Sequence, residues 1–209
     1  MLKLKIKNVM ITYVVIDVEC DGRIPGTNSM LGFGAVATNI IGENLGEFEI
    51  NMFPLEDCIS DKNTMKWFNN SAKEAFEYLN KNQVTPEEAL NKFGNWLLSL
   101  PAPRVMAAHP APFDYMWIHW YFKKYLNDKL DNHLDLSPYF DSKCGPALDI
   151  LSYASAILKK EYLNVGRENY DKEIHNNTKH THLAIDDARE YSKLLVSLLN
   201  RNIKYDKNR

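Results

Sequence analysis

The sequence has few cysteines and no long apolar run. Its three cysteines, Cys20, Cys58 and Cys144, are far apart and form no C-x-x-C pair, which makes a disulfide framework or a cysteine zinc site improbable. No apolar stretch approaches the roughly 18 to 20 residues of a membrane-spanning helix. The N-terminus has alternate lysines in place of the apolar segment of a signal peptide. We therefore expect a soluble, cytoplasmic protein without membrane contact.

The sequence also lacks a strong charge of either sign. Its 25 lysines and arginines nearly balance 27 acids, for a net charge of -2, which argues against a nucleic-acid partner unless bound cations change the sum. An apolar fraction of 45% in 209 residues excludes wholesale disorder. We expect one domain over residues 1–209, with its core at about 12–200 and a basic, fraying tail at 201–209.

The first part of the chain predicts an antiparallel meander. The β-branched run at 13–18 is followed by turn-forming residues, a second run at 30–38 is rich in small side chains, and 45–53 alternates apolar and polar residues. The small residues of the second strand would let another segment approach it closely.

The remainder alternates between helical and strand patterns. Thr85 before Pro86 is typical of a helix start, and that helix should end before Pro101. We also expect two short helices in 63–81, broken near Asn70, and a strand at 104–109. Helices are expected at 113–126, 147–160 and 182–200, with a loop at 161–181. The helix at 147–160 leaves room for a short fifth strand before it. This order predicts a mixed α/β fold.

Two carboxylates lie at the end of the first strand. Asp17 and Glu19 are two residues apart, so both side chains project from the same face of that strand. Burial of two like charges without compensation is very unfavourable. Taken alone, a pair of solvated surface acids explains the pattern equally well.

Two further acids and a histidine stand at helix starts. Asp114 heads an apolar stripe, although an acid in a first turn also suits the helix dipole. In the last helix Asp187 shares the apolar face with Tyr191, whereas Asp186 shares the polar face with Glu190, Lys193 and Ser197. His182 precedes Asp187 by five residues, and a lone histidine there is more often a solvated or capping residue.

Together, these acids form a stronger pattern than any of them does alone. Inward-facing carboxylates occur at three element ends in separate parts of the chain. A carboxylate cluster without a balancing cationic motif requires hard cations, and oxygen ligands suit Mg²⁺ or Mn²⁺. Two such ions about 3.5–4 Å apart form the usual clamp for phosphodiester displacement.

The motifs VIDVECDG, AAHPAPFDYMWI and HTHLAIDDARE, in this order, resemble those of the DnaQ-like, DEDD-type 3′–5′ exonucleases. Within that family, the sequence resembles the branch that has a histidine five residues before the last acid. This branch includes RNase T, oligoribonuclease and polymerase proofreading subunits. The resemblance spans roughly residues 12–200. The segment NTMKWFNNSAKEAFEYL is further similar to a subgroup with a T-M-x-W-W-like helix after the third strand.

The resemblance implies an RNase H-like fold, a mixed five-stranded sheet flanked by helices with its first three strands antiparallel. It implies that two Mg²⁺ or Mn²⁺ ions are held by Asp17, Glu19, Asp114 and Asp187, with His182 as general base. The implied partner is the 3′ end of single-stranded RNA or DNA, and the implied product a 5′-nucleoside monophosphate. Many relatives are homodimers, which is a further expectation.

Two positions depart from the family pattern. Cys20 stands where the family often has threonine, so a hydroxyl contact is missing there. Pro110 replaces the asparagine that is common in the second motif, which removes a side-chain contact near the 3′ end but no metal ligand.

The sequence identifies candidate substrate-binding residues less clearly than candidate metal ligands. Phe33 and Trp67 are candidates for base stacking, although residues of this type are about twice as often core residues. The backbone of Cys20, Asp21 and Gly22 directly follows the acidic strand and is a candidate wedge at the last nucleotide. A basic run before His182 could attract the substrate or simply be a solvated face; it comprises Lys159, Lys160, Arg167, Lys172 and Lys179.

Three other interpretations compete with the exonuclease. His175, His180 and His182 suggest zinc, but their spacing is irregular. An inactive RNase H-like binding module is disfavoured because all five catalytic positions are filled. An RNase H-like endonuclease could use the same carboxylates, and would cut a circular or 3′-blocked single strand that an exonuclease leaves intact.

The helix phase of the last motif gives a first testable prediction. Asp186→Asn is expected to leave activity nearly unchanged, whereas Asp187→Asn should be as damaging as Asp17→Asn, because only Asp187 faces the apolar stripe. Metal-dependent nuclease rates of the three variants measure the difference. Equal losses in Asp186→Asn and Asp187→Asn would contradict the helix phase.

Overall fold

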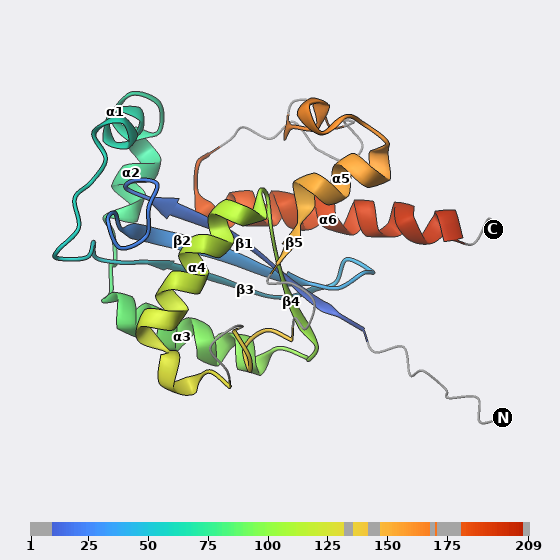
Figure 1. Cartoon of the computed structure of the whole chain (residues 1–209), viewed down its shortest axis with the longest axis horizontal. Helices are drawn as coiled ribbons and strands as arrows, with labels where there is room; N and C mark the ends of the chain where they lie inside the picture. Colours follow the sequence, from blue (N-terminus) through green and yellow to red (C-terminus); the bar gives the residue numbers. More distant parts are fainter. Residues whose placement is uncertain (1–9, 132–135, 142–146, 168–169, 171–180, 207–209) are drawn as a thin grey trace.

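The computed structural model describes residues 10–131, 136–141, 147–167, 170 and 181–206 (Figure 1). At its centre is a five-stranded sheet with the order β3-β2-β1-β4-β5. Its strands are β1 (Thr12–Cys20), β2 (Met30–Thr38), β3 (Asn44–Asn51), β4 (Arg104–Ala108) and β5 (Leu148–Asp149).

The sheet is mixed, as expected. β1 pairs antiparallel with β2, and β2 pairs antiparallel with β3, which confirms the meander. β1 and β4 are parallel, and so are β4 and β5. The pairing of β1 with β4 covers only Thr12–Val15 of β1, so the acidic end of β1 extends beyond its parallel neighbour.

Helices pack on both faces of the sheet (Figure 1). They are α1 (Lys62–Ser71), α2 (Lys73–Leu79), α3 (Pro86–Ser99), α4 (Ala111–Tyr125), α5 (Ile150–Leu158) and α6 (Ala184–Asp206). Two short 3₁₀ turns, Asn127–Lys129 and Tyr162–Asn164, complete the described elements. Within the described part of the chain, no helix is long and apolar enough to cross a membrane.

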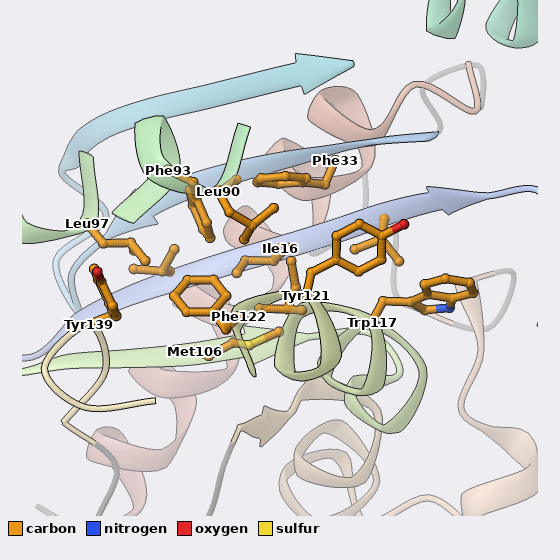
Figure 2. Close-up of a cluster of buried hydrophobic side chains, with 14 of the residues drawn as sticks. Ile16, Phe33, Leu90, Phe93, Leu97, Met106, Trp117, Tyr121, Phe122 and Tyr139 are labelled. Carbon is orange, nitrogen blue, oxygen red and sulfur yellow. The ribbon is translucent and has the colours of Figure 1, made fainter. Parts of the chain in front are cut away.

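The alternation of β1 separates two hydrophobic cores. Val14 and Ile16 face one core, which contains Phe93 of α3 and Trp117 of α4 (Figure 2). Val15 faces the other core, which α5 and α6 cover. Asp17 and Glu19 continue the parity of Val15, so the acidic pair is on the α6 face of the sheet.

Several predicted helix ends differ from the observed ones. The break predicted near Asn70 is confirmed and falls at Ala72, which leaves helical geometry (φ -139°, ψ 39°). α4 begins at Ala111, two residues before the predicted start. α6 begins at Ala184 and continues to Asp206, so the tail expected to fray from residue 201 is helical as far as Asp206.

Gly34 allows α6 to approach the sheet at the acidic end. It lies opposite Asp17 in the register of β1 and β2. A Cβ atom at Gly34 would lie 2.4 Å from the backbone nitrogen of Ile185 and 2.6 Å from the carbonyl carbon of Ala184. Backbone cannot move aside as a flexible side chain can, so only glycine fits. The close approach expected for the small residues of this strand is that of the first turn of α6.

This contact gives a second prediction. Gly34→Ala should push the first turn of α6, and with it Asp187, away from the sheet. Overpacking of this kind costs about 1–3 kcal/mol, so we expect a lower melting temperature together with weaker Mn²⁺ binding by calorimetry.

Val36→Ala provides the matched control, because Val36 packs against Ile185 and Ala188 and its truncation removes contacts without pushing α6. That variant should lose stability but keep its Mn²⁺ affinity. Unchanged Mn²⁺ affinity in Gly34→Ala would show that the close approach does not position Asp187.

Candidate active site

Three of the predicted ligands meet where β1 ends. Each of Asp17, Glu19 and Asp187 offers a carboxylate oxygen, and these atoms all lie within 4.8 Å of one another. β1 supplies two of the acids from one face, and the first turn of α6 supplies the third. We call these three residues the acidic triad.

Asp114 approaches the same strand from the first turn of α4. Its Oδ1 accepts a hydrogen bond of 3.1 Å from the backbone N–H of Val18, a residue beyond the part of β1 that pairs with β4. Asp114 therefore satisfies a strand donor, and its charge also acts on Glu19. The side chain is buried.

Burial and mutual repulsion raise the pKa values of these acids. Burial is the main cause for Glu19, reinforced by the charges of Asp187 and Asp114, and its pKa rises to about 8. Burial likewise raises the pKa of Asp114 to about 8, and that of Asp17 well above its ordinary value. A cluster that holds protons near neutral pH is one that a hard cation would stabilise.

Arg167, a member of the basic run predicted before His182, brings a positive charge directly to the acidic triad. Its Nη1 lies 3.5 Å from Asp187 Oδ1, and its Nη2 lies 2.5 Å from Glu190 Oε2. The expectation of a cluster without a balancing cation is therefore wrong. Glu190 was assigned to the polar face of the last helix, and that was also wrong, because Arg167 covers it and leaves its side chain only 13% exposed.

The rest of the helix phase holds. Asp187 is buried together with Tyr191, Leu194, Leu195 and Leu198. Asp186 instead pairs with Arg189 at 2.9 Å on the outside of α6.

His182 lies two residues before α6, close enough to Asp187 for its charge to act on that carboxylate. Its backbone is left-handed, with φ 56°, a conformation that non-glycine residues adopt only when their surroundings hold them there. Thr181 accepts a hydrogen bond from the Leu183 N–H and donates one to Asp186, which fixes this turn. Burial raises the pKa of Asp187, and this rise is opposed first by the charge of Arg167 and then by that of His182.

The two aromatic candidates occupy different environments. Trp67 of α1 is 39% exposed and packs edge-on against the His182 imidazole, with ring centroids 5.0 Å apart and an interplanar angle of 89°. Phe33 does not face the site. It is 1% exposed and packs against Phe48 and Phe93 in the α3–α4 core (Figure 2), so its proposed stacking on a base is not supported.

Cys20, Asp21 and Gly22 build the loop after β1. The Cys20 side chain is buried in the α3–α4 core, on the opposite face of β1 from Glu19. The Asp21 carboxylate accepts hydrogen bonds from the Ser29 N–H and the Ser60 hydroxyl, and its carbonyl accepts one from the Asp61 N–H. Asp21 thus ties the β1–β2 loop to the start of α1.

Gly22 meets a local steric requirement. A Cβ atom there would lie 2.1 Å from the Asn28 side chain. That side chain accepts hydrogen bonds from the Arg23 and Ile24 N–H groups, so it cannot move without opening the loop.

The basic segment before His182 is only partly described. Lys159 ends α5 in a left-handed conformation, and Arg167 is paired with α6. Lys160, whose carbonyl accepts a hydrogen bond from the Ser155 hydroxyl, follows α5. Four further predicted members of the basic run or of a zinc site, Lys172, Lys179, His175 and His180, lie outside the described residues.

Sequence reasoning also missed His109. This residue opens the second motif, stacks on Tyr191 with ring centroids 4.3 Å apart, and makes a hydrogen bond of 2.7 Å with the Tyr170 hydroxyl. It links the end of β4, the helix that carries Asp187 and the segment that contains Arg167. Its position within the second motif, AAHPAPFDYMWI, was the available signal.

The chain matches the model of the RNase T exonuclease family over residues 14–195 and belongs to that family. It is thus a member of the DEDD-type, DnaQ-like family of 3′–5′ exonucleases to which its motifs pointed, and the expectation of an enzyme is confirmed.

A full-length relative and several solved structures are similar to this chain. The 3′-5′ DNA exonuclease Cap18 of Escherichia coli is 27% identical over 201 residues, which cover 93% of this chain and 96% of Cap18. The nuclease domain of 3′hExo, a DEDDh family member bound to rAMP, has a TM-score of 0.66 at 12% identity and covers 90% of this chain and 92% of that domain.

A zinc-bound complex of E. coli ExoI with ssDNA has a TM-score of 0.63 at 14% identity. The match covers 91% of this chain and 40% of ExoI, so the chain spans two-fifths of that enzyme. These two structural likenesses confirm the expected fold.

The raised pKa values give a third prediction. The folded protein keeps a proton on Glu19 up to about pH 8, whereas the unfolded chain releases it near 4.5. In the presence of a chelator, stability should therefore be highest at low pH and fall as the pH rises from about 4.5 to about 8. Melting temperatures across this range, with EDTA or with Mn²⁺, measure the effect.

Mn²⁺ should flatten this slope by compensating the carboxylate charges. Asp17→Asn should flatten it as well and raise the melting temperature in EDTA by several degrees, since about 1 kcal/mol corresponds to roughly 2–4 °C in a protein of this size. A melting temperature that rises with pH in EDTA would show that the triad is not under electrostatic strain.

Proposed function

We propose that this protein is a divalent-metal-dependent 3′–5′ exonuclease that removes 5′-nucleoside monophosphates from single strands or 3′ overhangs. The observation that carries the proposal is the acidic triad with His182 beside it. Three carboxylates within 4.8 Å are an unfavourable arrangement for folding alone. Family membership supplies a reaction that requires such a cluster.

The donor set fits hard cations. All the candidate ligands are carboxylate oxygens, and burial and repulsion raise the pKa values of Asp17 and Glu19. In the proposed enzyme Asp17, Glu19, Asp187 and Asp114 hold two Mg²⁺ or Mn²⁺ ions. Such ions supply Lewis-acid activation of water and stabilisation of the leaving oxygen.

His182 is proposed as the general base. The charge of His182 acts on Asp187, which supports a position from which its imidazole could take a proton from the attacking water, and the ordinary histidine pKa of about 6.5 suits that role. Trp67 packs edge-on against the ring and is proposed to hold it in place. A role for Trp67 in stacking on a base is compatible with its exposure.

The proposed substrate is the 3′ end of a single nucleic-acid strand. The relative Cap18 is a DNA exonuclease, while the 3′hExo structure contains rAMP, so both polymers must be compared. Homodimer formation is a separate prediction from the family resemblance, which sedimentation analysis can test.

The deciding experiment uses matched 5′-labelled RNA and DNA strands with Mg²⁺, Mn²⁺ or EDTA. An exonuclease should produce a ladder that shortens from the 3′ end and release 5′-monophosphates, and only with a divalent ion. The same strands with a blocked 3′ end, or circularised, should resist. Cleavage of circular strands would instead support the endonuclease, and intact substrates with tight binding would support the inactive module.

His182→Ala gives a fourth prediction. Its rate should fall by roughly two to four orders of magnitude, the range typical for loss of a general base. Its Mn²⁺ affinity should stay close to that of the wild type, because His182 is not a proposed ligand. A tenfold or greater loss of Mn²⁺ affinity, with the rate restored at high Mn²⁺, would identify His182 as a metal ligand and refute the assignment.

A further inference from the structure

Arg167 lies between two carboxylates that are one helical turn apart on α6. Its guanidinium faces Asp187 with Nη1 and Glu190 with Nη2. All three side chains are largely covered, at 21%, 8% and 13% exposed respectively. The positive charge is thus held at the edge of the acidic triad and not in bulk solvent.

The two carboxylates bind Arg167 differently. The contact with Glu190 is short, at 2.5 Å, while the contact with Asp187 is 3.5 Å, longer than an ordinary N–H···O hydrogen bond. Glu190 is not a member of the triad. Glu190 therefore fixes one edge of the guanidinium, and the other edge points toward the atoms that would hold the metal ions.

A phosphate bound at the triad would bring negative oxygens to this second edge. The guanidinium is planar and presents its N–H groups as a fork that matches two oxygens of a phosphate. Positive groups fixed beforehand around a transferring phosphoryl group are a common way to stabilise its charge. To bind such a phosphate, Nη1 of Arg167 would exchange its long contact with Asp187 for a phosphate oxygen.

We propose that Arg167 contacts the substrate: anchored by Glu190, it binds a non-bridging oxygen of the terminal phosphate held at Asp17, Glu19 and Asp187. This inference rests on the proposed function. It assigns Glu190 as a positioning residue that acts through Arg167. The alternative is that Arg167 only ties the segment before α6 to that helix.

Calorimetric titration of 5′-AMP and 5′-dAMP in Mn²⁺, with adenosine as the ligand without phosphate, separates the two roles. In Arg167→Gln the affinity for the monophosphates should fall about tenfold or more, since charged hydrogen bonds are among the strong ones. The affinity for adenosine should not change. The Mn²⁺ affinity should be equal or higher, because a positive charge beside Asp187 has been removed.

Arg167→Lys should recover part of the monophosphate affinity, and Glu190→Gln should lose part of it without loss of Mn²⁺ binding. Arg189→Gln is the matched control. Arg189 lies on the same helix but pairs with Glu47 and Asp186 at the surface, so its loss should leave monophosphate binding unchanged. If Arg167→Gln does not fold, Arg167→Lys and Glu190→Gln test whether Arg167 binds the phosphate.

Two results would overturn the proposal. Equal monophosphate affinity in Arg167→Gln and wild type would show that the guanidinium does not touch phosphate. A parallel fall in the affinities for Mn²⁺, monophosphate and adenosine would show that Arg167 is only a structural tie. If the wild type itself neither binds Mn²⁺ nor degrades a 3′ end, the proposed function fails, which is distinct from failure of Arg167 alone.

Discussion

The main constraint on this structure is the burial of like charges. Asp17, Glu19 and Asp187 are held within 4.8 Å of one another, with Asp114 close by, and each gives up hydration that its charged form needs. The hydrophobic packing on both sides of the sheet must offset that penalty. The ends of three elements, β1, α4 and α6, meet at this site, where folding stability is reduced and the proposed cations would compensate the charge.

Three different structural features position the four acids. Strand alternation places Asp17 and Glu19 on one face. A missing side chain at Gly34 lets the α6 backbone, and with it Asp187, approach that face. Asp114 is held through the Val18 N–H, which β4 leaves without a ladder partner. All four acids lie on strands or helices and not in loops, so the contacts that hold the sheet and its helices together also position the acids.

Local patterns in the sequence were sufficient for the strands, the acid positions and the helix phase that separates Asp186 from Asp187, because periodicity and strand parity are local properties. They failed where long-range contacts decide. Phe33 reads like a stacking residue but faces the α3–α4 core. Glu190 lies on the polar side of a helical wheel, yet Arg167 covers it from a segment 23 residues earlier. Such an ion pair leaves no periodic signal.

The proposed base is held in a different way from the acids. His182 lies in a turn before α6 in a left-handed conformation that costs of the order of 1–3 kcal/mol for a non-glycine residue. Thr181 and Trp67 hold it there. Trp67 belongs to α1, whose start is joined by Asp61 to the backbone of Asp21, directly after the acidic strand. The orientation of the imidazole thus depends on the β1–β2 loop and α1 as well as on α6. The acids lie on β1, α4 and α6 and not on α1, so we expect a change in α1 to disturb the proposed base more than the proposed metal ligands.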